Sequence, residues 1–181
     1  QRLAWESFLA GKDGLIHSPT GSGKTLAAIV GPLLERLAEA EPSEGADPIR
    51  VIWITPLRAL ASDTAAALRE AVEGLGVPFS VALRTGDTSA AEKTKQRKKL
   101  PSSLITTPES LTLLLTHHEV LEQFKGLRAV VCDEWHELLG SKRGVQTDLA
   151  LSRLRKLAPK LRVWGVSATL GNVQEAAQAL V

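Results

Sequence analysis

The chain has 181 residues, of which 44% are apolar and 23% charged, and a formal net charge of +2. This length and composition fit one globular α/β domain and exclude intrinsic disorder. No apolar run approaches the roughly 18 residues that a membrane span needs, and the charge is too small to indicate a nucleic-acid partner by itself. A single cysteine, Cys132, excludes an internal disulfide, so we expect a small core residue in a protein of the cytoplasm. Because the chain opens at Gln1 without Met and ends at Val181 inside a helical pattern, we expect a fragment.

Six short apolar runs predict six strands. In chain order they are Gly14–Ser18, Val51–Thr55, Phe79–Arg84, Ser103–Thr107, Ala129–Cys132 and Arg162–Ser167. Helical periodicity fills the segments between them. The predicted helices are Lys24–Ala40, Leu57–Glu73, Ser89–Leu100, Glu109–Leu115, Val145–Leu157 and Asn172–Val181.

The alternation of strands and helices predicts a doubly wound α/β fold with a mostly parallel sheet and ligands at the carboxyl ends of its strands. Runs that are apolar throughout, such as Val51–Ile54, are typical of strands covered by helices on both faces. The polar segment Glu39–Pro48 predicts a surface loop. The amphipathic helix before the last strand places five apolar residues on one face: Val145, Leu149, Ala150, Leu154 and Leu157.

The string Ser18–Thr25 follows a predicted strand and opens a predicted helix, which is the context of a phosphate-binding P-loop. Its glycines let successive backbone N–H groups point at phosphate oxygens, and the helix N-terminus adds partial positive charge. The residues that we expect to hold the nucleotide are Thr20, Gly21, Ser22, Gly23, Lys24 and Thr25. Lys24 can reach the β- and γ-phosphates, and the Thr25 hydroxyl can ligate Mg²⁺. Ser18 replaces the usual first glycine of the string, and a chance Gly/Ser turn is the alternative interpretation.

Two carboxylates, Asp133 and Glu134, come directly after the apolar strand Ala129–Cys132. In P-loop enzymes an acidic residue at such a strand end completes the coordination of Mg²⁺, so we assign this role to Asp133. Glu134 can orient or deprotonate the attacking water. The alternative is an acidic cap on the next helix.

Several short strings, taken in order, resemble the motifs of superfamily-two DExH helicases. After the P-loop these are Thr55–Leu60 (motif Ia), the Thr85–Asp87 turn, Thr106–Leu111 (motif Ib), Asp133–His136 (DExH box) and Ser167–Thr169 (motif III). The longer string Asp133–Gly144 resembles the large helicase-related (Lhr) family, and within it the bacterial ligase-associated DExH helicases. The resemblance implies that residues 1–181 form the first of two RecA-like domains, with ATP and Mg²⁺ as cofactors.

The resemblance also implies roles for single residues. Gln1 is in the place of the glutamine that reads the adenine edge, although a surface amide is an equal alternative. Ser167 and Thr169 would couple the state of the γ-phosphate to domain closure, and His136 would bond to the second domain.

The resemblance implies a track for the phosphates of one nucleic-acid strand, formed by Pro56, Arg58, Gly86, Asp87, Thr107 and Pro108. Hydroxyl, N–H and guanidinium donors of this kind grip the backbone and read no sequence. Arg58 could equally be a solvated residue at a helix start. The basic run Lys93–Lys99 has five positive charges in seven residues, and either contacts nucleic acid or forms a solvated helix face.

We therefore predict an ATP-dependent 3′-to-5′ DNA helicase of DNA repair. Its implied partners are single-stranded nucleic acid, the second RecA-like domain and DNA repair proteins, with no membrane, in a nucleoid-associated cytoplasmic setting. An RNA helicase or double-strand translocase of the same superfamily, a small-molecule P-loop kinase and a non-catalytic ATP-binding module are the alternatives.

Overall fold

The computed structural model describes residues 1–39, 48–169, 173–178 and 180. Its six strands form one sheet in which every neighbouring pair is parallel, in the order β1-β6-β5-β2-β4-β3. The strands are β1 (Gly14–His17), β2 (Val51–Ile54), β3 (Val81–Arg84), β4 (Ser103–Thr106), β5 (Ala129–Cys132) and β6 (Arg162–Ser167). All six predicted strands are present, and the parallel sheet confirms the predicted α/β class.

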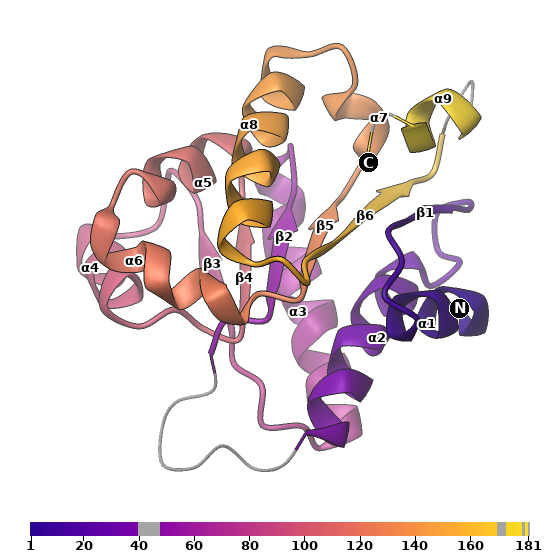
Figure 1. Cartoon of the computed structure of the whole chain (residues 1–181), viewed down its shortest axis with the longest axis horizontal. Helices are drawn as coiled ribbons and strands as arrows, with labels where there is room; N and C mark the ends of the chain where they lie inside the picture. Colours follow the sequence, from indigo (N-terminus) through magenta and orange to yellow (C-terminus); the bar gives the residue numbers. More distant parts are fainter. Residues whose placement is uncertain (40–47, 170–172, 179, 181) are drawn as a thin grey trace.

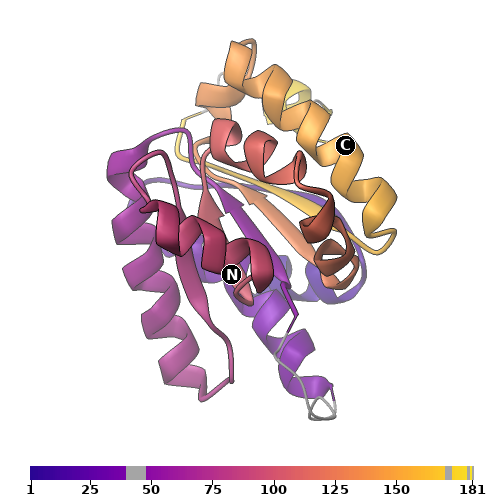
Figure 2. The same ribbon diagram turned by 90° about the vertical axis from the view of Figure 1, so that its left-hand side faces the viewer.

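Helices connect the strands and cover both faces of the sheet (Figures 1 and 2). In the described residues they are α1 (Arg2–Leu9), α2 (Lys24–Ala38), α3 (Arg58–Leu75), α4 (Ala90–Lys98), α5 (Pro108–Leu115), α6 (His118–Leu121), the 3₁₀ helix η1 (Glu122–Gly126), α7 (Trp135–Leu138), α8 (Lys142–Leu157) and α9 (Val173–Gln178). The sequence patterns missed α1, which packs against α2, and the one-turn helices α6 and α7. Most of the predicted loop Glu39–Pro48 and both ends of the predicted helix Asn172–Val181 lie outside the described residues.

The core has two halves because side chains alternate across a strand. On β2, Ile52 and Ile54 face the cluster formed with α5, α7 and α8, whereas Val51 and Trp53 face the cluster formed with α1, α2 and α3. All four side chains are fully buried. The continuous apolar run therefore has the origin that the sequence predicted, a strand with helices on both sides.

The buried face of α8 differs from the expected one. Val145 and Leu149 are 60% and 68% exposed, whereas the polar Thr147 is fully buried. The Thr147 hydroxyl donates to the Arg143 carbonyl at 2.8 Å, so it is buried without losing a hydrogen bond. Thr147 thus occupies an inward position, and of the five predicted apolar residues only Ala150 and Leu154 are buried, with Leu157 half-buried.

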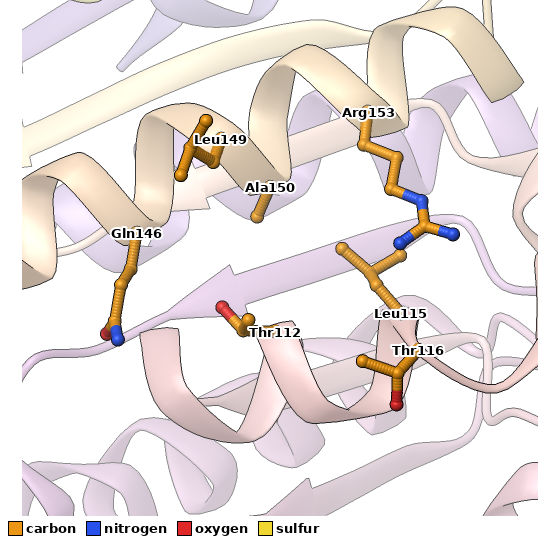
Figure 3. Close-up of a pocket in the computed structure, with 7 residues that line it drawn as sticks. All are labelled: Thr112, Leu115, Thr116, Gln146, Leu149, Ala150 and Arg153. Carbon is orange, nitrogen blue, oxygen red and sulfur yellow. The ribbon is translucent and has the colours of Figure 1, made fainter.

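A hollow of about 200 Å³ lies beside the exposed Leu149, between α5 and α8. Figure 3 shows Thr112 and Leu115 of α5, and Thr116 just after it, below Ala150 and Arg153 of α8. None of the predicted site residues lines it. Within the described residues, no helix is long and apolar enough to cross a membrane.

Candidate functional site

The loop between β1 and α2 is a tight turn that needs two glycines. Gly21 and Gly23 have φ of 78° and 80°, in the left-handed region that glycine adopts at little cost. Ser18, at the first position of the string, fits because its hydroxyl donates to the Ser22 hydroxyl at 2.6 Å. The departure from the usual glycine is therefore accommodated by a hydrogen bond within the loop.

The ammonium group of Lys24 lies over this loop. It donates to the carbonyl oxygens of Ser18 and Pro19, each at 2.9 Å. The side-chain amide of Gln1 donates to the Gly23 carbonyl at 3.4 Å. Gln1 is thus hydrogen-bonded to the loop rather than detached from it, and its contact with adenine stays a prediction.

Asp133 follows β5 and has a hydrogen-bond donor on each carboxylate oxygen. The indole N–H of Trp53 donates to Oδ2 at 3.1 Å, and the backbone N–H of Glu134 donates to Oδ1 at 3.0 Å. Burial raises the pKa of Asp133, although both donors and the charge of Lys24 act in the opposite direction. Trp53 was not predicted as a site residue, because nothing in the sequence shows that β2 lies next to β5.

Glu134 has a strained backbone. Its φ of 45° makes it the one non-glycine residue with positive φ among the described residues. Such strain costs of order 1–3 kcal/mol and is concentrated at functional sites. The strained turn fixes the direction in which this carboxylate leaves the end of β5.

A chain of polar contacts leads from Glu134 to the end of β6. His136 Nδ1 lies 3.5 Å from a Glu134 carboxylate oxygen and shares a hydrogen bond of 2.8 Å with the Ser167 hydroxyl. Ser167 donates its one hydroxyl proton to the Thr169 carbonyl at 3.0 Å, so Nδ1 of His136 carries the proton in the shared bond. The DExH box and motif III are therefore joined within this domain, and the bond from His136 to a second domain stays a prediction.

The P-loop, Asp133 and Glu134 open into one cleft of about 470 Å³. It is lined by Thr20, Gly21, Gly23, Lys24, Thr25, Leu60, Asp63, Thr64, Ala67, Asp133, Glu134 and Val166. The wall from α3 was not predicted as part of the site, since its side chains belong to an ordinary amphipathic helix pattern.

The cleft contains the oxygen ligands that Mg²⁺ prefers, a hydroxyl from Thr25 and a carboxylate from Asp133. Among the described residues no group of three His, Cys, Asp or Glu side chains could hold a metal alone. Two protein ligands suit a magnesium ion whose other ligands are phosphate oxygens and water.

The predicted track lies at the carboxyl ends of β2, β4 and β3. Arg58 forms an exposed ion pair with Asp87 at 3.4 Å, and a Cβ on Gly86 would lie 2.8 Å from the Arg58 guanidinium. Thr107 and Pro108 are buried, and the Thr107 hydroxyl accepts from the Ser110 N–H at the start of α5. The structure brings Arg58, Gly86 and Asp87 together and uses the Thr107 side chain as a helix cap.

Arg143, at the start of α8, joins the two candidate motifs of this track. Its guanidinium donates to the Pro56 carbonyl at 2.9 Å and to the Glu109 carboxylate at 2.7 Å. Burial acts to raise the pKa of Glu109, but hydrogen bonds from the backbone, Thr107 and Arg143 outweigh it and leave the pKa lowered. The sequence includes Arg143 in the Lhr-like string but gives no sign of these contacts.

Comparison with known proteins relates this chain to helicases. The DEAD/DEAH box helicase model matches residues 1–176. The ATP-dependent helicase Lhr-Core of Methanothermobacter thermautotrophicus is 38% identical over 190 residues, covering 100% of this chain and 22% of that protein. This chain therefore spans about a fifth of the relative's length.

Two solved structures share the fold. Mycobacterium smegmatis helicase Lhr bound to single-stranded DNA and AMP-PNP has a TM-score of 0.82 and 36% identity, covering 98% of this chain and 23% of that chain. The DUF1998 helicase MrfA bound to DNA and AMPPNP has a TM-score of 0.84 and 26% identity, covering 99% of this chain and 25% of that chain. These matches confirm the RecA-like fold and the resemblance to Lhr helicases, while the narrower ligase-associated assignment stays a prediction. With a family match over nearly its whole length, the chain belongs to the DEAD/DEAH box helicases.

Proposed function

We propose that residues 1–181 form the first of two RecA-like motor domains in an ATP-dependent helicase that moves 3′ to 5′ along single-stranded DNA. The observation that carries this proposal is the single cleft in which the P-loop meets Asp133 and Glu134. From this cleft, polar contacts through His136 lead to Ser167. A site for hydrolysis alone has no need of such a connection, whereas a motor must transmit the state of the nucleotide.

Nucleotide binding would rearrange contacts that the domain already makes. Lys24 would exchange the carbonyl oxygens of Ser18 and Pro19 for β- and γ-phosphate oxygens. Thr25 and Asp133 would hold the magnesium ion, which neutralises charge on the phosphates. Gln1, already bonded to the loop, would contact the adenine edge.

Glu134 would orient the attacking water and accept its proton, from a carboxylate direction that the strained backbone fixes. His136 lies between this carboxylate and Ser167, so a change at the γ-phosphate would alter the contacts of Ser167 and Thr169. An arginine finger from the second domain would supply the remaining charge, and such a group contributes roughly 10³ to 10⁵ in rate.

The choice of DNA rests on the similarity to the mycobacterial Lhr helicase, which was solved with single-stranded DNA. Pro56, Arg58, Gly86, Asp87, Thr107 and Pro108 would line the track. We further propose a role in DNA repair, with repair proteins as partners, in the cytoplasm at the nucleoid.

Phosphate release, measured with and without oligo-dT or oligo-rU for this chain and for the whole protein, tests the proposal. We expect DNA-stimulated release from the whole protein and almost none from residues 1–181, because in this proposal the finger and the opposite wall belong to the second domain. Glu134→Gln in the whole protein should keep ATP affinity and lose turnover. Robust DNA-stimulated turnover by the short chain would refute the two-domain mechanism, and preferential stimulation by oligo-rU would favour an RNA helicase.

A further inference from the structure

A second groove, of about 360 Å³, lies beyond the predicted track, between α4 and α5. Figure 2 shows both helices on the side that faces the viewer. The groove begins at the Gly86 turn after β3 and at Ser110 in the first turn of α5. It is lined by Arg84, Gly86, Ala90, Lys93, Thr94, Arg97, Ser110, Leu113 and His117.

Three cations line this groove and make their hydrogen bonds to neutral oxygens. Arg84, only 5% exposed, donates to the Lys93 carbonyl at 3.1 Å and to the Gln96 side-chain oxygen at 3.3 Å. Lys93 donates to the Gly86 carbonyl at 2.9 Å, and Arg97 to the Thr94 hydroxyl at 3.3 Å. Among the described residues that line the groove, none is Asp or Glu.

Three other arginines of this domain pair with carboxylates. Arg143 pairs with Glu109 at 2.7 Å, Arg155 with Asp13 at 3.0 Å and Arg162 with Glu35 at 2.7 Å. At Arg84, burial and then the neighbouring charge of Arg97 lower the pKa. Clustered cations without a counter-ion raise the free energy of the folded domain, and an anion in the groove would offset that cost.

The position and lining of the groove indicate which anion it takes. Gly86 belongs to both the predicted track and the groove, and Lys93 is hydrogen-bonded to it, so the two surfaces are continuous. Leu113, which is 65% exposed, adds an apolar wall against which a sugar or base can pack. A cationic groove with one apolar wall suits a nucleotide chain better than a small inorganic anion.

We propose that this groove binds phosphates of the nucleic-acid strand after it leaves the Gly86 turn, through Arg84, Lys93 and Arg97. This assignment rests on the proposed function. It also places the cations of the basic run Lys93–Lys99 on two different surfaces. Lys93 and Arg97 are half-buried and face the groove. Lys95 and Lys99 are exposed and line a different hollow on the other side of α4, beside β3.

This division provides a matched control on one helix. In the whole protein, the pair Lys93→Gln and Arg97→Gln is compared with the pair Lys95→Gln and Lys99→Gln. Both remove two positive charges from α4 and its C-cap residue Lys99, so their long-range electrostatic effects are similar. The measurement is the affinity for fluorescent oligo-dT as a function of salt concentration, with nucleotide affinity in the absence of DNA as a check on folding.

We expect the groove pair to lower the slope of log affinity against log salt by about 1.4, at about 0.7 for each lost single-strand contact. The control pair should leave the slope near that of the wild type. Equal slopes for the two pairs, with DNA binding retained, would overturn the groove assignment and leave the proposed function standing. Equal displacement of oligo-dT by polyglutamate of matched charge would also overturn it, in favour of an acidic peptide. A wild-type protein that binds no strand would refute the proposed function together with the groove.

Discussion

The hydrogen bond from Trp53 to Asp133 gives the sharpest test of the candidate metal site. Trp53 is fully buried on β2, and its indole N–H donates to Oδ2 of Asp133 at 3.1 Å. Replacing Trp53 by Phe removes this donor and keeps an aromatic ring in the core. Burial raises the pKa of Asp133 and the hydrogen bond from Trp53 lowers it. Without this donor the pKa of Asp133 therefore rises further, and its carboxylate is less firmly oriented.

The expected magnitude follows from the kind of bond that is lost. A hydrogen bond to a charged group contributes about 1.5–3 kcal/mol, which is about 10- to 150-fold in an equilibrium constant at tenfold per 1.4 kcal/mol. The Glu134 N–H still holds the other oxygen of Asp133. We therefore expect the lower end, a loss of about tenfold in metal affinity.

The assay is the binding of Mn²⁺ together with a non-hydrolysable ATP analogue, followed by the electron paramagnetic resonance of free Mn²⁺. Trp164→Phe is the matched control. Trp164 belongs to the same buried cluster as Trp53, and its indole nitrogen has no hydrogen-bond partner among the described residues. Both variants lose the same ring atoms, but only one loses a donor to the carboxylate. Equal metal affinities for the two variants would refute the assigned role of the indole N–H.

Three further predictions concern the P-loop, the track and the core. Lys24→Ala should weaken nucleotide binding strongly by calorimetry while the circular dichroism spectrum stays that of the wild type. Arg143→Lys removes the guanidinium that donates to both the Pro56 carbonyl and the Glu109 carboxylate, so affinity for oligo-dT should fall. Nucleotide affinity in the absence of DNA is the control. Glu35→Gln leaves the guanidinium of Arg162, only 10% exposed, without its carboxylate and should cost about 3 kcal/mol of unfolding free energy. The control for Glu35→Gln is Glu6→Gln, in an exposed pair, which should cost under about 1 kcal/mol in the same denaturant titration.

The fold was predictable because a strand that is buried on both faces is apolar at every position of its sequence. Two apolar runs are buried along their whole length in the parallel sheet, Val51–Ile54 and Ala129–Cys132. The P-loop was predictable because the turn needs glycine at two positions of positive φ. The buried face of α8 was not, since Thr147 is buried through a bond to its own helix that no periodicity reveals.

Contacts between distant elements could not be predicted for a different reason. Trp53 and Asp133 are 80 positions apart, and they meet because β2 is the neighbour of β5. Arg84 looked like the end of a strand, and its proposed role depends on how α4 and α5 lie beside it. Composition and spacing indicate which residues could form a site, but they do not indicate which strands are neighbours in the sheet.

The order of the strands divides the domain into two halves, whose carboxyl ends carry different candidate sites. β1, β6 and β5 lie side by side, and their carboxyl ends carry the P-loop, motif III and the DExH box. β2, β4 and β3 form the other half, and their ends carry the candidate nucleic-acid track. In a motor, the nucleotide site and the track must be connected, and contacts that cross from the β5 side to the β2 side can provide this connection.

Trp53 and Arg143 make hydrogen bonds of this kind. Trp53, on β2, donates to the carboxylate that we expect to hold the metal. Arg143 lies in the first turn of α8, shortly after the DExH box, and donates to both the Pro56 carbonyl and the Glu109 carboxylate of the track. A movement of the strand end after β5 would therefore pull on β2 through one residue and on the track loops through the other. Because neither residue is needed to bind phosphate, their variants should separate coupling from binding. ATP affinity and DNA affinity would then each persist in part, while the effect of one ligand on the affinity for the other is reduced.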